Sequence, residues 1–352
     1  MSPKSEYQCT GKLFEDDFAE EISPAPLKKE EEYKQEIVWK NVGYIVYFHV
    51  AALYGLYLIF TSGKIETFLF SVFLFIFSGL GITCGAHRLY AHRSFKATTP
   101  LKILFMIMNS MAFEDSIYEW VRNHRVHHKF TETTADPHDS RRGFFFSHCG
   151  WLMIRKHPDV KRKGQTVDVS DLEQDSVIMF QKKYYKYLMP FFTFFVPTII
   201  PVLFWGESLN NAFHIAGMFR YTYLTNMVWL VNSAAHIYGM RPYDKNINPR
   251  ENRLVAFLTL GEGWHNYHHV FPWDYRSSEL GLFRYNFTTR FIDWMGQIGW
   301  AYDMKSVSRD IIQKRAKRTG DGSYYKPVWG WDDQDLSSEI KKDAFIRFSK
   351  TE

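Results

Sequence analysis

The stretch TFLFSVFLFIFSGLGITCGAHRLYAH, residues 67–92, decides the fold because it joins a membrane-length apolar run directly to two histidines. Its first part, residues 67–86, contains no Lys, Arg, Asp, Glu or His. At about 1.5 Å of rise per residue, a helix of this length covers roughly 30 Å, the thickness of the hydrocarbon core of a bilayer. The stretch therefore predicts a transmembrane helix that presents His87 and His92 at its end.

Three further runs have the length and composition of membrane spans, at residues 42–60, 187–205 and 212–231. The last of these is interrupted by Arg220. Residues 1–36 are charged and have no apolar core, so we expect no signal peptide and insertion directed by the first span. The predicted fold class is an all-α integral membrane protein with four transmembrane helices and a helical cytosolic cap. Four buried helices of a soluble bundle are the alternative.

The distribution of charge predicts the topology. The links at residues 61–66 and 206–211 carry one Lys and no basic residue, respectively, whereas residues 87–186 and the chain after 236 are rich in Lys and Arg. Because basic loops stay in the cytosol, we expect a multi-pass protein with both termini and the long middle segment cytosolic. The expected organisation is a flexible cytosolic segment at 1–36, a membrane domain at 37–302 and a cytosolic tail at 303–352.

The net charge of +5 resides mostly in the part of the chain expected in the cytosol. Its basic residues are not interleaved with an exposed aromatic platform of the kind that binds single-stranded nucleic acid. Anionic headgroups of membrane lipid or a phosphorylated substrate are therefore the expected partners, and nucleic acid is not.

Nine histidines fall in four patches that are far apart in the sequence: His87 and His92; His124, His127 and His128; His236; and His265, His268 and His269. In HRVHH and HNYHH the spacing is i, i+3 and i+4, which on a helix covers an arc of roughly 100°. Imidazole suits iron, copper and zinc. Because one ion needs only three or four ligands, nine histidines predict a two-metal centre. His87 and His92, five residues apart, need either a locally loosened turn or different metals.

Other residues that could bind metal show no comparable pattern. The three cysteines are scattered and give no CxxC spacing. Cys84, one helical turn before His87, is interpreted as a small packing residue, with metal ligation as the alternative. The other five histidines show no cluster geometry: His49, His138, His148, His157 and His214. Two of them, His49 and His214, lie in expected spans, where an ionisable residue is a functional candidate by default.

Five motifs together resemble the animal acyl-CoA desaturases of the stearoyl-CoA desaturase type: GITCGAHRLYAHRSF, YEWVRNHRVHHKFTET, RRGFFFSH, NSAAH and GEGWHNYHHVFPWDYR. The chain is particularly similar to insect members, including those that make pheromone precursors. The resemblance, from about Val38 to Tyr302, implies a four-span enzyme of the endoplasmic reticulum membrane with two iron ions. It implies as ligands all nine clustered histidines and, through a water molecule, Asn232.

Such an enzyme uses O2 to insert a double bond into the acyl chain of a fatty acyl-CoA, in fatty acid or pheromone-precursor biosynthesis. The chain has neither the haem-binding HPGG of fused relatives nor a GxGxxG dinucleotide motif, so the resemblance implies cytochrome b5 and NADH-cytochrome b5 reductase as electron-donating partners. One rival is a membrane di-iron hydroxylase or monooxygenase, which commonly has HxxxH where this chain has HxxxxH. A non-catalytic metal-binding receptor is the rival of another class.

The resemblance also implies substrate contacts. For the phosphates and polar part of CoA these are Asn41, Arg122, Arg155 and Lys156, and for the acyl tunnel Trp229. An ordinary solvated pair, or a lipid-headgroup contact, is the alternative for Arg155 and Lys156. Two further residues, Phe75 and Gly79, lie four apart on one helix face and are expected at the tunnel floor, with packing as the alternative. The chain departs from the family pattern at two positions, with Asp115 where the family often has Asn and Asn123 where it often has Asp, so CoA contact at these two positions is left open.

Overall fold

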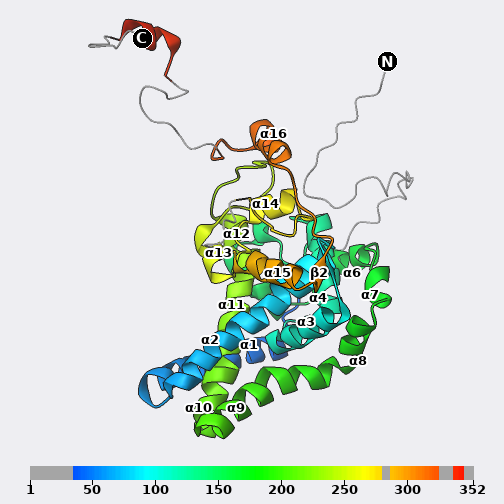
Figure 1. Cartoon of the computed structure of the whole chain (residues 1–352), viewed down its shortest axis with the longest axis vertical. Coiled ribbons are helices and arrows are strands. Elements are labelled where there is room, and N and C mark those ends of the chain that lie inside the picture. Colours follow the sequence, from blue (N-terminus) through cyan, green and yellow to red (C-terminus); the bar gives the residue numbers. More distant parts are fainter. Residues whose placement is uncertain (1–34, 280–285, 325–335, 345–352) are drawn as a thin grey trace.

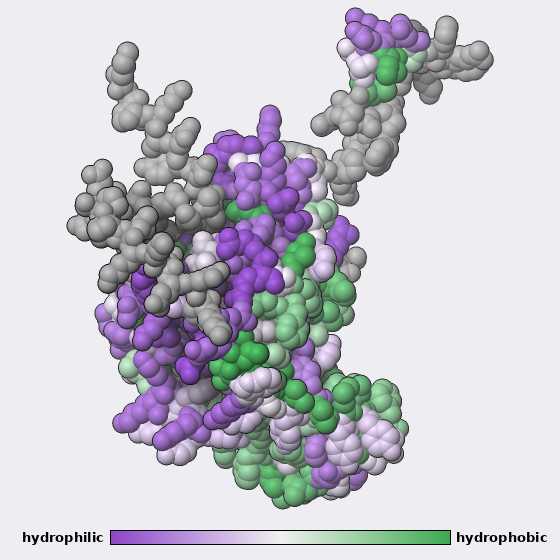
Figure 2. Space-filling view, turned by 180° about the vertical axis from the view of Figure 1, so that it is seen from behind, coloured by the Kyte–Doolittle hydropathy of each residue, from purple (hydrophilic) through white to green (hydrophobic). Residues whose placement is uncertain are grey.

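The computed structural model describes residues 35–279, 286–324 and 336–344. Figure 1 shows an elongated arrangement of helices, with α2, α9 and α10 reaching the lower end and α14 and α16 at the opposite end. Surface character follows the same axis. Figure 2 shows mainly hydrophobic residues over the lower end and hydrophilic residues over the end that carries α16. The molecule thus has an apolar end and a polar cap.

Three helices in the described ranges are long and apolar enough to cross a membrane. The first is α1 (Trp39–Thr61), and the second is α2 (Ile65–Leu80) continued by the π-helical segment η2 (Gly81–Ala91). The third is made of α8 (Ser176–Pro190), η5 (Phe191–Phe195) and α9 (Val196–Trp205). These helices contain the predicted spans 42–60, 67–86 and 187–205.

The fourth predicted span, 212–231, lies in a helical run composed of α10 (Leu209–Ala212), η6 (Phe213–Phe219) and α11 (Arg220–Asn232). This run is not among the three membrane-length apolar helices of the described residues. The guanidinium of Arg220 is buried inside it and donates to the carbonyls of Ala216, Met111 and Thr193 at 3.2, 3.0 and 2.8 Å. Pro197 has no N–H for the Thr193 carbonyl four residues before it, so Arg220 satisfies an acceptor that the proline frees.

The polar cap is built from two parts of the chain. The part between the second and third membrane-length helices contains α3 (Thr99–Ala112), α4 (Ile117–Phe130), η3 (Ser140–Arg142), α5 (Phe144–His148), η4 (Gly150–Met153), α6 (Pro158–Gly164) and α7 (Ser170–Glu173). The part after α11 contains α12 (Ala234–Ile237), α13 (Arg253–Leu258), α14 (His265–Val270), α15 (Phe287–Gln297) and α16 (Arg309–Thr319). Helix α17 (Ser338–Asp343) is drawn apart from the cap in Figure 1 and buries none of its residues. Strands β1 (Lys96–Ala97) and β2 (Ala301–Tyr302) pair antiparallel and join the two parts.

The main hydrophobic core lies where α3, η2 and α4 meet. Leu101 and Phe105 of α3, Cys84 of η2 and Val121 of α4 are fully buried in it. Gly81 permits the close approach of η2 to α3, because a Cβ atom there would lie 2.3 Å from the backbone nitrogen of Asn109. This packing fixes the end of the second membrane-length helix against the cap, and that end carries the first two histidines.

Candidate metal centre

The local structure at the end of the second helix explains how two histidines five residues apart can face the same side. Segment η2 is π-helical, and the His92 N–H donates to the His87 carbonyl five residues before it at 3.1 Å. The wider turn brings both imidazoles to one side, with ring centroids 4.8 Å apart. The turn is therefore locally loosened, which is one of the two alternatives that the spacing left open, and both histidines belong to the same group.

The helices that carry the other two histidine boxes begin at specific caps. For α4, the Ser116 hydroxyl accepts from the Glu119 N–H at 3.4 Å, and Glu119 adds a negative charge to the first turn. For α14, the capping position is Trp264, which has no oxygen in its side chain. The buried Glu251 supplies the capping acceptor instead, because its carboxyl accepts from the Tyr267 N–H at 2.8 Å. Burial raises the pKa of this carboxyl to about 8.

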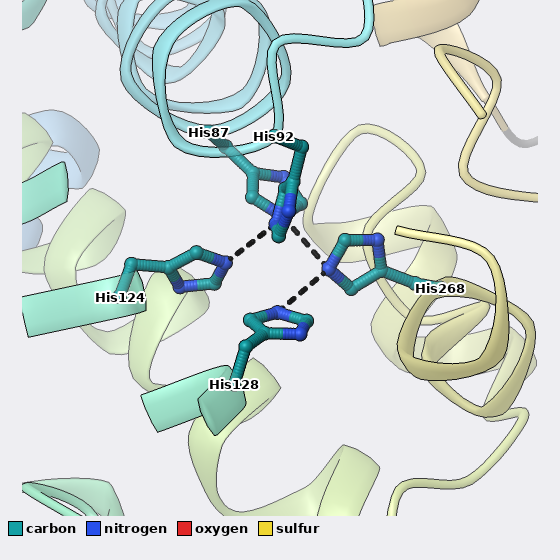
Figure 3. Close-up of side chains that lie close together, drawn as sticks. All are labelled: His87, His92, His124, His128 and His268. Carbon is teal, nitrogen blue, oxygen red and sulfur yellow. Dashed lines mark hydrogen bonds between the residues drawn. The ribbon is translucent and has the colours of Figure 1, made fainter. Parts of the chain in front are cut away.

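Five histidines from three elements converge on one point, shown in Figure 3, and we name them the five-histidine cluster: His87, His92, His124, His128 and His268. One potential ligand atom from each lies within 4.8 Å of the others. The Nε2 of His268 is 3.0 Å from that of His87 and 3.0 Å from that of His128. The Nε2 atoms of His92 and His124 are 2.9 Å apart.

The other four form a second group within the same 4.8 Å limit, the four-histidine cluster: His127, His236, His265 and His269. The Nε2 of His265 is 3.0 Å from the Nε2 atoms of both His236 and His269. The two clusters adjoin, because the rings of His128 and His269 stack with centroids 4.1 Å apart. Both the HRVHH and the HNYHH box are therefore divided between the clusters.

Two buried carboxylates hold the outer ring nitrogens, and sequence reasoning did not identify either. Glu262 lies 2.7 Å from His87 Nδ1 and 2.6 Å from the buried guanidinium of Arg88. Burial acts to raise the pKa of Glu262, but Arg88 and His87 outweigh it and lower the pKa to about 2. Asp136 lies 2.8 Å from His127 Nδ1. Here too burial acts to raise the pKa, and His127 brings it far below the ordinary range. The only sequence signal was that each carboxylate lies close to a histidine box.

The residues fit metal ions. Burial, followed by neighbouring imidazoles, holds the pKa values well below normal for seven histidines, which are therefore neutral: His92, His124, His128, His236, His265, His268 and His269. With the Nδ1 proton of His87 directed at Glu262, its Nε2 presents a lone pair to the cluster. At His127, burial acts to lower the pKa but Asp136 raises it, and the buried Nε2 has no hydrogen-bond partner. A cation satisfies these converging nitrogens without any proton between them.

Three nearby residues separate into different roles. Asn232, expected to act through water, lines the cavity described below together with His127 and His265. Cys84 donates to the Thr288 carbonyl at 3.7 Å and belongs to neither cluster, as the packing interpretation predicts. The prediction that His138 shows no cluster geometry is wrong. Its buried ring lies 5.4 Å from that of His127 and groups with Asp136.

A cavity of about 230 Å³ adjoins both clusters. Histidines of both clusters line one part of it, namely His87, His124, His127 and His265. Most of the rest of its wall is apolar or aromatic, including Ile82, Phe113, Trp120, Leu224 and Leu260. The expected acyl-tunnel residues all line it: Phe75, Gly79 and Trp229. Asp115 and Asn123, the two departures from the family pattern, line it as well. The cavity suits an extended apolar chain held beside the clusters.

The residues expected to contact CoA do not all come together. Arg155 and Lys156 line a second cavity of about 260 Å³, and Trp151 lines both cavities. Burial lowers the pKa of Lys156, whose ammonium donates to Asn123 at 3.3 Å. Neither of the other two lines the second cavity: Arg122 pairs with Glu119 at 2.5 Å, and Asn41 donates to the Leu152 carbonyl at 2.8 Å.

Comparison with known proteins agrees with this geometry. Residues 65–287 match the family model described as fatty acid desaturase. The chain is 56% identical to the acyl-CoA Delta-9 desaturase of Acheta domesticus over the whole of both chains. It is 54% identical to the acyl-CoA Delta(11) desaturase of Trichoplusia ni over 98% of both. Identity to the stearoyl-CoA desaturase of Homo sapiens is 52% over 89% of this chain and 84% of that relative. The chain belongs to the fatty acid desaturase family.

Proposed function

We propose that this protein is a fatty acyl-CoA desaturase, an oxidoreductase that inserts a double bond into the acyl chain of a fatty acyl-CoA with O2. The observation that carries the proposal is the pair of buried histidine clusters beside a largely apolar cavity. The names of the relatives support the same substrate class. Those relatives include, besides the desaturases, a (11Z)-hexadec-11-enoyl-CoA conjugase of Bombyx mori, 53% identical over 84% of this chain. A role in pheromone-precursor synthesis is part of the proposal.

The proposed membrane arrangement has four spans in the endoplasmic reticulum, with both termini cytosolic. Histidines of both clusters come partly from the segment after the second helix and partly from the chain after α11. This convergence supports our placing both segments on one side of the membrane, with two crossings between them, by the third helix and by the α10–α11 run. The hydrogen bond from the Val38 N–H to the Met153 carbonyl, at 2.7 Å, supports our placing the chain just before α1 on that side as well. The domain limits proposed are 1–36, 37–302 and 303–352.

The proposed metal centre consists of two iron ions, one in each histidine cluster, with Asn232 acting through water. An all-nitrogen donor set suits iron, and the absence of a carboxylate within either cluster of described residues would leave bound ions more positively charged. Bound iron would supply the redox chemistry that reduces O2 and oxidises two neighbouring methylene groups. Glu262 and Asp136 orient His87 and His127 through their Nδ1 atoms. Electrons come, in this proposal, from cytochrome b5 and its NADH-dependent reductase.

The chain's own residues bind and orient the substrate. The CoA phosphates are assigned to the basic side of the second cavity, where Arg155 and Lys156 lie. Trp151, which lines both cavities, marks the passage from the polar to the apolar part. The acyl chain then follows the wall that contains Trp229 and ends near Phe75 and Gly79. An apolar wall excludes water from the carbon pair that reacts and holds that pair in place.

Product analysis tests the proposal directly. We expect desaturase-deficient yeast that expresses this chain to accumulate monounsaturated acyl chains, detected by gas chromatography–mass spectrometry. The matched control, His268→Ala, should insert into the membrane and make no such product. Hydroxylated acyl chains as the main product would favour the hydroxylase rival. Bound iron without O2 consumption, in the presence of acyl-CoA, cytochrome b5 and reductase, would favour a non-catalytic metal-binding receptor.

A further inference from the structure

Four polar side chains outside the metal clusters form a continuous hydrogen-bonded chain behind the cavity wall. They are His49 of α1, Asn226 of α11, His148 of α5 and Ser233, which follows α11. His49 Nε2 lies 3.1 Å from Asn226 Nδ2, and Asn226 Oδ1 lies 3.2 Å from His148 Nε2. His148 Nδ1 lies 3.0 Å from the Ser233 hydroxyl. We call this set the relay; it joins a membrane-length helix, a cap helix and the end of α11.

The donors and acceptors of the relay can be assigned from the partners of each side chain. His49 Nδ1 is 2.7 Å from the Ile45 carbonyl, so it carries the proton, and Nε2 accepts from the Asn226 amide. Burial lowers the pKa of His148, so this ring is neutral and donates from Nε2 to Asn226. Its Nδ1 then faces the Ser233 hydroxyl at 3.0 Å, and the single hydrogen of that hydroxyl is shared with the Trp229 carbonyl, 2.9 Å away. A connected polar network in a partly buried position favours one arrangement of the elements that carry it.

Two functional positions depend on this arrangement. The Trp229 indole, part of the cavity wall, stacks on the His49 ring at 6.4 Å and meets the His148 ring edge-on at 5.7 Å. Ser233 N–H donates to the Trp229 carbonyl at 3.1 Å, and the Ser233 carbonyl accepts from His236 N–H at 3.1 Å. The relay therefore contacts Trp229 on the side away from the cavity. It also fixes the interruption of the helix between Asn232, where α11 ends, and His236 in α12.

We propose that the His49–Asn226–His148–Ser233 relay is a positioning device that fixes Trp229 in the cavity wall and thereby sets which carbon pair of the acyl chain meets the metal centre. This inference rests on the proposed desaturase function. The relay residues are positioning residues, since none of them lies in either histidine cluster. Their effect should appear in where the double bond is placed more than in how much metal is bound.

The test compares two variants that break the relay in different ways. Asn226→Leu has a similar volume and removes both central hydrogen bonds. His148→Phe keeps a ring against Trp229 and removes both nitrogens. His148→Gln can still donate to Asn226 and serves as the conservative rescue. His214→Phe is the matched control, because the described residues give His214 a hydrogen bond to the Asn210 carbonyl of its own helical run, at 2.9 Å, and a ring contact with Tyr54 that Phe can keep. His214 does not line the cavity.

We expect Asn226→Leu and His148→Phe to divert product to neighbouring double-bond positions and to raise KM roughly 2- to 10-fold, the change expected when one or two hydrogen bonds are lost. Iron content should stay at the wild-type level. His148→Gln should restore most of the wild-type ratio of double-bond positions, called the positional ratio. His214→Phe should match wild type in this ratio. An unchanged positional ratio in both relay variants overturns the inference, and so does a loss of iron or of folded protein with the ratio unchanged. If one variant does not fold, the other decides. Wild-type protein that makes no double bond refutes the proposed function instead.

Discussion

Removal of the Glu262 carboxylate is the perturbation that most clearly links the metal centre to the fold. Its two oxygens serve two buried donors, His87 Nδ1 at 2.7 Å and Arg88 at 2.6 Å. In Glu262→Gln only one oxygen is left, and the amide NH2 group faces a donor whichever way it turns. The substitution therefore keeps the volume of the side chain while leaving one buried donor without an acceptor.

The expected losses of iron affinity and of stability follow from the two partners of Glu262, which are His87 and Arg88. Loss of an outer partner of a metal-binding histidine typically weakens metal binding about 10- to 100-fold. Loss of one partner from a buried ion pair typically costs about 3–5 kcal/mol of stability. Arg88 keeps its bonds to the Tyr275 carbonyl and the Thr289 hydroxyl, at 2.9 and 2.8 Å, so we expect a cost at the lower end, about 3 kcal/mol.

The assay pairs iron affinity, measured by competition with a chelator in detergent, with thermal unfolding of the same preparations. Asp310→Asn is the matched control, since it also removes one carboxylate charge but from an exposed pair with Lys314. We expect the control to match wild type and Glu262→Gln to lose both iron affinity and stability. Wild-type iron affinity in Glu262→Gln would refute the role assigned to the carboxylate.

Three further substitutions test the cavity and the cap. Gly79→Leu should shift products toward shorter acyl chains, because a Cβ atom there already lies 3.1 Å from the flexible end of Leu260 and the larger side chain fills the cavity. Phe75→Ala should shift products toward longer chains, and competition between acyl-CoAs of different length measures both shifts; unchanged ratios would place the tunnel end elsewhere. Burial acts to raise the pKa of Asp171, but hydrogen bonds from Arg125 and Arg93 lower it to about 2. This contribution to stability is complete above the ordinary pKa of 3.8 and is lost as the pH falls through about 2, so Asp171→Asn should flatten the acid side of a stability-versus-pH curve, and an unchanged slope would contradict it.

The nine histidines could be predicted because their spacing is a local property of the sequence. Their division between two clusters could not, since it depends on how α4 and α14 face each other and on the π-helical turn before His92. Glu262 and Asp136 were not identified because a single carboxylate near a histidine box has no periodicity. Glu262 and His87 are far apart in the sequence, and only the packing of the folded chain brings them into contact.

The ends of the membrane helices were less predictable than their existence. The third helix begins at Ser176 instead of residue 187, because its charged first turns are helical outside the apolar run. The second continues to Ala91 because the histidine-bearing turn is π-helical. Predictions for residues 1–34 and for parts of the tail after residue 324 lie outside the described residues.

The proposed two-iron centre can be tested by the number of iron ions bound per chain. We expect two ions in purified wild-type protein, one for each histidine cluster, measured by inductively coupled plasma mass spectrometry. Loss of His92 and His268 together should remove the ion of the five-histidine cluster and leave one, and loss of His236 and His265 together should remove the other. Wild-type protein with fewer than two ions, or an iron content that neither double variant lowers, would contradict a two-iron centre at these histidines.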